Sequence, residues 1–124
     1  MEIEAALKEA MTIEGALGVA LVDWTSGMSL GTLGGGKYLD LEVAAAGNTE
    51  VVRAKMRTLE ALHLDDKIED ILISLSTQYH LIRLLRGRAD ATEGLFLYLA
   101  LDRAKSNLAL ARHSLRQIEA ELVV

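Results

Sequence analysis

The chain has 124 residues, of which 51% are hydrophobic, 25% charged and 4% aromatic, and its formal net charge is −5. This length predicts one domain spanning residues 1–124, and the balance is that of a globular protein with an aliphatic core rather than a disordered chain. A net acidic chain is not drawn to phosphate backbones or anionic lipids, so no nucleic acid partner is expected. Without cysteine it has neither a disulfide framework nor a thiolate metal site.

The start of the chain is acidic, with Glu2 and Glu4, and lacks the basic segment of a signal peptide. The longest uninterrupted apolar runs, 15–22 and 95–101, are too short to span a bilayer. We therefore expect neither export nor membrane insertion, and the cytoplasm is the expected compartment.

Hydrophobic periodicity predicts a helix followed by a β-hairpin. The helix is expected at about 2–11, and the strands at 16–24 and 28–33, on either side of a turn at 25–27. Glycines in and after the second strand favour an edge position and a loose connection to the next element.

Asp40 is the expected N-cap of a long helix at about 41–62. One side of this helix is apolar and is expected to face the core; it carries Leu41, Ala45, Val52, Met56 and Leu59. A second side carries Val43 and small residues, namely Ala46, Gly47, Ala54 and Ala61. Small residues let another backbone approach closely, so we interpret the second side as an interface. The alternative interpretation is that both sides pack inside one domain, since Ala is also simply a good helix former.

Three further strands are predicted at 67–76, 79–86 and 95–101, with a polar loop at 87–94. The last strand is apolar on both faces, which is typical of a central strand. Asp102 is the expected cap of a final helix, whose apolar seam comprises Ala104, Leu108, Ala111, Leu115, Ile118 and Leu122. The order α-β-β-α-β-β-β-α with tight turns predicts an α/β (α+β) fold: a five-stranded, mainly antiparallel sheet with helices on both faces.

Residues 27–31 match the G-x-S-x-G motif that exposes a serine nucleophile in α/β-hydrolases. The motif needs a sharp strand-to-helix turn, whereas Ser29 falls inside a predicted hairpin strand. Asp102 and His113 follow later in the chain, as such residues do in any sequence. A hydrolase using Ser29 is therefore the weakest of the functional hypotheses, and we expect no catalytic residues.

Two other patterns bear on ligand binding. Gly34–Gly36 and Lys37 precede a helix, where a phosphate cradle would lie, but Tyr38 stands where a Walker loop needs Ser or Thr. His63 lies near Asp65 and Asp66, too few ligands for a metal site. A flexible connection and a polar turn are the preferred interpretations, so neither a cofactor nor a metal is expected.

The remaining candidate residues are interpreted without special chemistry. His80 and His113 are read as an ordinary strand residue and an ordinary helix residue. Arg83, Arg86 and Arg88 form a small basic cluster, which we interpret as a solvated rim; the alternative is a contact with an acidic protein partner.

Three stretches carry a resemblance to a known family: GALGVALVDWTSGMSLGTLG, IEDILISLSTQYHLIRLL and LFLYLALDRAKSNLALARHSLRQIE. With the order of elements and the length, they resemble the two hairpins and the final strand and helix of the roadblock/LC7 family (dynein light chain, MglB-like). The resemblance implies a profilin-like fold, with the second helix on one face of the sheet and the terminal helices on the other.

The resemblance also implies a mode of action. Family members form homodimers or heterodimers with related subunits through the second helix and third strand, and they bind small Ras-like GTPases as regulators or scaffolds. The dimer interface then comprises Val43, Ala46, Gly47, Glu50, Ala54, Ala61, Ile71 and Ile73. The polar residues Asn48, Thr49 and Glu50, in the middle of the helix, depart from an apolar interface.

The leading hypothesis is a non-catalytic dimeric interaction module that regulates or scaffolds a small Ras-like GTPase. The main alternative is a small-molecule sensor domain, because sensor sheets share this outline. A sensor needs a pocket with polar and aromatic lining, and the chain has only five aromatic residues.

Overall fold

The computed structural model describes residues 1–86 and 94–123, and its elements follow the predicted order. The helices are α1 (Ile3–Met11), α2 (Leu41–Ala61), the 3₁₀ turn η2 (Arg103–Lys105) and α3 (Leu108–Glu121). The strands are β1 (Ala16–Asp23), β2 (Met28–Gly34), β3 (Asp70–Ser74), β4 (Gln78–Leu84) and β5 (Leu95–Asp102). The third strand is shorter than predicted, and the predicted loop at 87–94 lies outside the described residues apart from Gly94.

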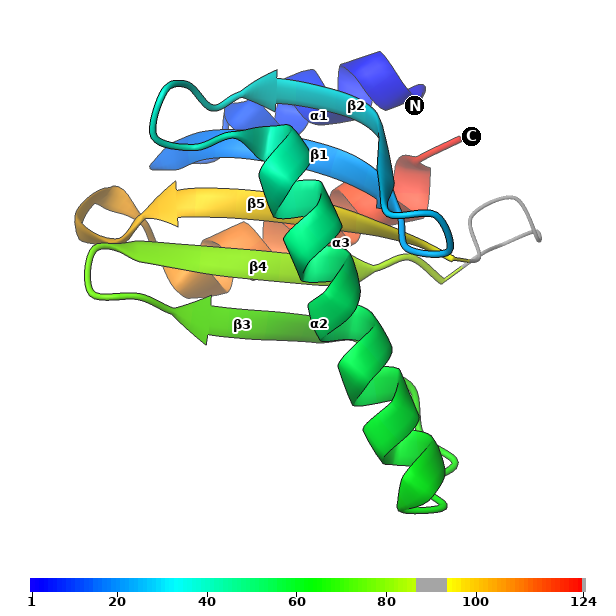
Figure 1. Cartoon of the computed structure of the whole chain (residues 1–124). Coiled ribbons are helices and arrows are strands. Elements are labelled where there is room, and N and C mark those ends of the chain that lie inside the picture. Colours follow the sequence, from blue (N-terminus) through cyan, green and yellow to red (C-terminus); the bar gives the residue numbers. More distant parts are fainter. Residues whose placement is uncertain (87–93, 124) are drawn as a thin grey trace.

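The five strands form one antiparallel sheet, as predicted, and their order in the sheet is β2-β1-β5-β4-β3 (Figure 1). β5 is the middle strand, and its residues from Leu95 to Leu101 are all buried, which confirms its predicted central place. β2 and β3 form the two edges of the sheet. Each edge strand therefore has a neighbour on one side only.

Helices cover both faces of the sheet, because alternate residues of the central strands are apolar on both sides. The core on the α1 and α3 face includes Val19, Leu21, Leu97, Leu99 and Leu101. The core on the α2 face includes Ala20, Val22, Phe96, Tyr98 and Ala100. In Figure 1, α2 crosses the front of the sheet while α1 and α3 lie behind it. No helix within the described residues is long and apolar enough to cross a membrane.

A capping side chain sets the start of α2. The Asp40 carboxylate accepts hydrogen bonds from the backbone N–H groups of Glu42 and Val43, at 3.0 and 3.2 Å, which confirms it as the N-cap of α2.

The prediction for the last helix was wrong at its start. Asp102 accepts from the Ala104 N–H and caps η2, whereas Asn107 accepts from the Leu110 N–H and caps α3. The chain is extended at Ser106 between the two caps, so Ala104 is exposed and outside the helical seam. Two capping residues five positions apart thus begin two separate helical segments, η2 and α3, instead of one long helix.

The glycine-rich connection after β2 is hydrogen-bonded rather than loose. Gly36 and Leu39 exchange backbone hydrogen bonds of 3.1 Å, and the Gly35 N–H donates to the Leu17 carbonyl at 2.8 Å. Gly35 has φ +78°, and a Cβ there would lie 2.7 Å from the Leu39 carbonyl oxygen. This close approach explains a glycine at that position.

Arg83, expected at a solvated rim, is instead 6% exposed. Its Nε donates to Glu119 of α3 at 2.7 Å, and its Nη1 lies 4.0 Å from Asp70, with no hydrogen-bond partner among the described residues. Arg112 of α3 holds Asp70 through two hydrogen bonds of 2.8 and 3.0 Å, which raise the pKa of the guanidinium. Buried charges need such partners, so this ion-pair network ties β3 and β4 to α3.

Arg86 remains exposed and pairs with Glu69 at 3.2 Å, while its backbone N–H donates to Glu119 at 2.8 Å. Arg88 lies outside the described residues. Arg83 and Arg86 therefore do not form one basic cluster: Arg83 belongs to a buried ion pair and Arg86 to a surface ion pair.

Candidate interaction surface

α2 is fixed against the sheet at its middle by Arg53. The guanidinium donates through Nε to the Trp24 carbonyl at 3.0 Å and through Nη2 to the Thr25 carbonyl at 2.5 Å. These bonds join the helix to the turn between β1 and β2. Arg53 was not predicted as a functional residue, because the only local signal in the sequence is Glu50 three positions earlier, with which Arg53 pairs at 3.3 Å.

The first half of α2 packs on the sheet as predicted. Leu41, Ala45 and Val52 are buried in the core. Met56 is half-buried and packs against the same core. The C-terminal part of α2 extends past β3, at the edge of the sheet (Figure 1). Leu59, predicted to face the core, is only half-buried and belongs to neither core cluster. That prediction was wrong because helical periodicity predicts which side of the helix a residue lies on. It does not predict where the sheet beneath the helix ends.

Apolar side chains gather beyond the edge of the sheet. Leu62 and Leu64, directly after α2, are 59% and 51% exposed. Together with the half-buried Leu59 they form an apolar end of the helix that this protomer does not cover. Exposed large apolar side chains grouped in this way mark a surface that another molecule can bury.

The outward side of α2 carries the predicted interface residues. All six of them are exposed in the protomer: Val43, Ala46, Gly47, Glu50, Ala54 and Ala61. A Cβ built at Gly47 meets nothing within 4 Å, so no contact inside the protomer accounts for a glycine in this helix. The alternative that this small-residue side packs inside the domain is wrong, whereas its role in a dimer stays a prediction.

The polar residues in the middle of α2 are accommodated by the helix itself. Thr49 is buried, and its hydroxyl donates to the Ala45 carbonyl at 2.8 Å; the Asn48 side-chain amide donates to the Ala44 carbonyl at the same distance. Glu50 points outward and pairs with Arg53. Of these three residues, only Glu50 places a charge on the outward side.

β3 offers an open backbone edge. Leu75 donates to the Gln78 carbonyl and Leu84 to the Glu69 carbonyl, so in the observed register Ile71 and Ile73 form hydrogen-bonded pairs with β4. The intervening residues, Leu72 and Ser74, therefore direct their backbone N–H and C=O groups away from β4. A free strand edge of this kind can pair with another strand.

The side chains of β3 lie on two faces. Ile71 and Ile73, predicted interface residues, are half-buried and pack against the core on the α2 face. Leu72 lies on the opposite face and is 41% exposed. The two isoleucines thus share a face with α2, as an interface built from both elements requires.

The structure does not assemble a serine nucleophile at Ser29. The hydroxyl of Ser29, inside β2, donates to the Glu42 carboxylate at 2.8 Å. No hydrogen bond joins it to a histidine within the described residues. The hydroxyl thus links β2 to the first turn of α2.

The three histidines lie apart. His63 ends α2 with a positive φ of 55°, and His113 is exposed on α3. His80 is half-buried in β4 and joins the hydroxyl of Tyr98 at 3.2 Å to the side chain of Gln78 at 2.8 Å. In residues 1–86 and 94–123, no three His, Asp or Glu side chains converge to hold a metal ion.

Three of the five aromatic residues, Trp24, Phe96 and Tyr98, belong to or pack against the core on the α2 face. Phe96 and Tyr98 are buried in the core, while Tyr38 is 92% exposed beneath the Lys37 ammonium. Burial raises the pKa of Tyr98 to about 12. Nothing in this arrangement favours the sensor alternative, which needs aromatic groups around a cavity.

Comparison with solved structures identifies the fold. A structure of Myxococcus xanthus MglB aligns with a TM-score of 0.79 at 16% identity and covers 94% of this chain and 81% of its own. A roadblock/LC7 domain from Streptomyces avermitilis aligns at 0.75 and 12%, covering 98% and 94%. An MglB with tetrameric arrangement aligns at 0.68 and 17%, covering 95% and 88%.

No protein-family model matches the chain, and no curated protein matches it in sequence. The structural likeness extends over nearly the whole chain, so the protein has the roadblock/LC7 fold. The expected profilin-like arrangement, with α2 on one face and the terminal helices on the other, is confirmed.

Proposed function

We propose that the protein is a non-catalytic interaction module that forms a dimer through α2 and β3 and serves as a regulator or scaffold of a small Ras-like GTPase. The observation that carries the proposal is the outward side of α2. It carries small and apolar residues that the protomer leaves exposed, beside the charged Glu50, and it includes a glycine with no neighbour at its Cβ position. A helix that only packed on its own sheet would gain from polar residues there.

The edge of β3 supplies the second half of the interface. Two copies related by a two-fold axis can pair their β3 edges antiparallel, because a symmetric interface uses the same surface of both partners. The sheet would then continue beneath the projecting end of α2. The partner would cover Leu59, Leu62 and Leu64, which one protomer leaves partly or largely exposed.

The fold likeness supports an assembly of this kind. One of the similar structures is an MglB with tetrameric arrangement. Roadblock/LC7 proteins, which the sequence resembles, pair with themselves or with related subunits and bind small Ras-like GTPases. A regulator of this class acts by holding or reshaping its partner, so it needs an interface and not a catalytic group of its own. A chain without cysteine suits the cytoplasm, which we propose as its compartment.

Light scattering on the wild type and on Ala54→Glu tests the dimer. Ala54 lies exposed on the outward side of α2, so a carboxylate there leaves the protomer intact but places a charge in the proposed interface. We expect a wild-type dimer and a monomeric variant. The matched control is Ala109→Glu, at an exposed alanine of α3, which should stay dimeric. A monomeric wild type, or a dimer that Ala54→Glu leaves unchanged, would contradict the proposal.

The GTPase part needs a separate experiment. Immobilised wild-type protein should retain a Ras-like GTPase from a panel loaded with GTP or GDP, whereas Ala54→Glu should retain less if the GTPase binds the dimer. Retention of none by a wild type that is a dimer would remove the GTPase from the proposal and leave the dimeric scaffold.

A further inference from the structure

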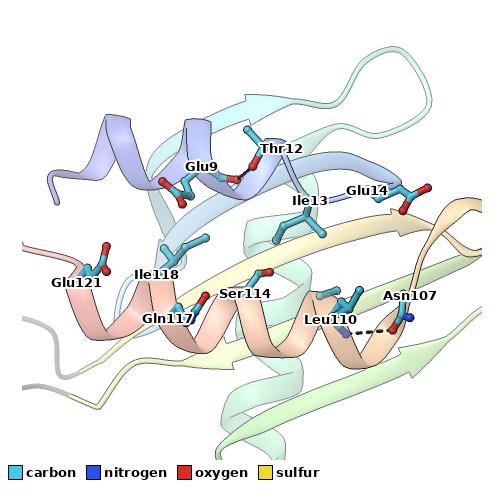
Figure 2. Close-up of a pocket in the computed structure, with 11 residues that line it drawn as sticks. Glu9, Thr12, Ile13, Glu14, Asn107, Leu110, Ser114, Gln117, Ile118 and Glu121 are labelled. Carbon is cyan, nitrogen blue, oxygen red and sulfur yellow. Dashed lines mark hydrogen bonds between the residues drawn. The ribbon is translucent and has the colours of Figure 1, made fainter.

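A groove of about 380 Å³ runs between α1 and α3, on the face of the sheet opposite α2 (Figure 2). Its lining includes the buried Ala111 and Ile118 and the half-buried Ile13, all apolar. Leu110, on the α3 side, is 62% exposed. The groove is thus bounded by two helices and contains apolar surface that the protomer leaves uncovered.

The charge of the groove has one sign. Glu9, Glu14 and Glu121 are its ionisable residues, and no Lys or Arg is among the residues that line it. Figure 2 shows Glu121 at one end, Glu14 at the other and Glu9 on the α1 side. The N-terminal nitrogen of Met1 donates to the backbone carbonyl of Glu121 at 2.6 Å and not to its carboxylate.

These carboxylates differ from others in the chain. Asp70 and Glu119 are held by arginines, and Glu42 accepts from Ser29. Within the described residues, the carboxylates of Glu9, Glu14 and Glu121 make no ion pair or hydrogen bond. Their negative charge is therefore free to act on a molecule in the groove.

We propose that this groove binds a basic amphipathic helix of a protein partner. Side chains, and not an open strand edge, form both walls, so the groove suits a ligand that satisfies its own backbone hydrogen bonds. Apolar residues on one face of such a helix would cover Ile13 and Leu110. Lysines or arginines near its two ends would face Glu14 and Glu121.

This second surface is independent of the proposed dimer. α1 and α3 lie on the opposite face of the sheet from α2, so one protomer can present both surfaces at once. Loss of either binding event therefore leaves the other to be measured.

The test uses a designed probe, a peptide of 14 residues, the length of α3, with leucines along one helical face and lysines toward both ends. Its counterpart has glutamates in place of the lysines. Backbone amide spectra of the isotopically labelled protein report the binding site. The lysine peptide should shift amides of residues 9–14 and of α3 while leaving those of α2 in place, and the glutamate peptide should shift none.

Two matched double variants decide whether the groove carboxylates are responsible. Glu14→Lys with Glu121→Lys should weaken binding of the lysine peptide by about tenfold, because like charges then meet at both ends. Glu60→Lys with Asp65→Lys makes the same change of net charge at exposed positions near the end of α2 and should change the affinity less than about twofold. The proposal is overturned if both doubles weaken binding equally, if shifts lie outside the groove, or if the lysine peptide does not bind.

Discussion

Arg83 in β4 donates a hydrogen bond of 2.7 Å to Glu119 in α3, and the two side chains are only 7% and 10% exposed. Glu119→Ala leaves a buried guanidinium without this partner and should lower the free energy of unfolding by about 3 kcal/mol. Arg83→Met combined with Glu119→Leu should recover most of this loss, because an apolar pair has no charge to desolvate. Urea unfolding of the wild type, Arg83→Met, Glu119→Leu and the double variant gives the coupling; losses that simply add would contradict the ion-pair account.

His80 should make stability depend on pH near neutrality. Burial lowers its pKa below the usual 6.5, so the unfolded chain takes up a proton at a higher pH than the folded protein. The free energy of unfolding should therefore be highest above that value and should decline as the pH falls through it. The Tyr98 hydroxyl lies 3.2 Å from Nδ1 of His80, and its pKa is raised to about 12. This hydroxyl is therefore neutral over the pH range of the histidine transition and provides no negative charge to stabilise a protonated His80.

Urea unfolding between about pH 7.5 and 5.5 measures this effect, since that range spans the ordinary histidine transition. The loss seen in the wild type should be smaller in His80→Gln and unchanged in His113→Gln, whose histidine is exposed. Identical pH profiles for the wild type and His80→Gln would refute this assignment.

His63 ends α2 in a conformation that favours glycine. Its φ is 55°, its N–H donates to the Glu60 carbonyl, and the N–H of Leu64 donates to the Leu59 carbonyl. His63→Gly should raise the free energy of unfolding by about 1 kcal/mol, because it removes the steric cost of a left-handed residue. His63→Ala is the control and should gain nothing; an equal gain from alanine would show that the backbone conformation is not the cause.

Two substitutions at Gly47 test the stability of the protomer and the stability of the dimer separately. In the Ala54→Glu background, Gly47→Ala should raise the free energy of unfolding by about 0.5–1 kcal/mol, since glycine disfavours a helix and the added methyl meets nothing. In the wild-type background, Gly47→Leu should weaken the dimer, which sedimentation across a dilution series measures. An unchanged dissociation constant for Gly47→Leu would place the interface elsewhere.

The order of elements and the place of each helix were predictable because they depend on local signals. Alternating apolar residues predicted the strands, and the strand from Leu95 to Leu101, apolar on both faces, predicted the centre of the sheet. Asp40 predicted the start of α2. The two sides of α2 were also visible as a period of apolar and small residues.

What the sequence did not reveal depends on contacts between distant residues. Arg83 looks like a surface arginine until Glu119, 36 positions away, is placed against it by the fold. Arg53 reaches backbone carbonyls of a turn 28 and 29 residues earlier, which no side-chain pattern records. The groove between α1 and α3 brings Glu9 and Glu14 to Glu121 from opposite ends of the chain.

The measurement that tests the central claim most directly is hydrogen exchange at the backbone amides of Leu72 and Ser74. Both amides point away from β4, so they should exchange rapidly in a protomer with a free β3 edge. If two copies pair through β3, both amides should be protected in the wild type and should lose that protection in Ala54→Glu. Rapid exchange of both amides in a wild type that light scattering shows to be a dimer would contradict the account, because that dimer would not use β3.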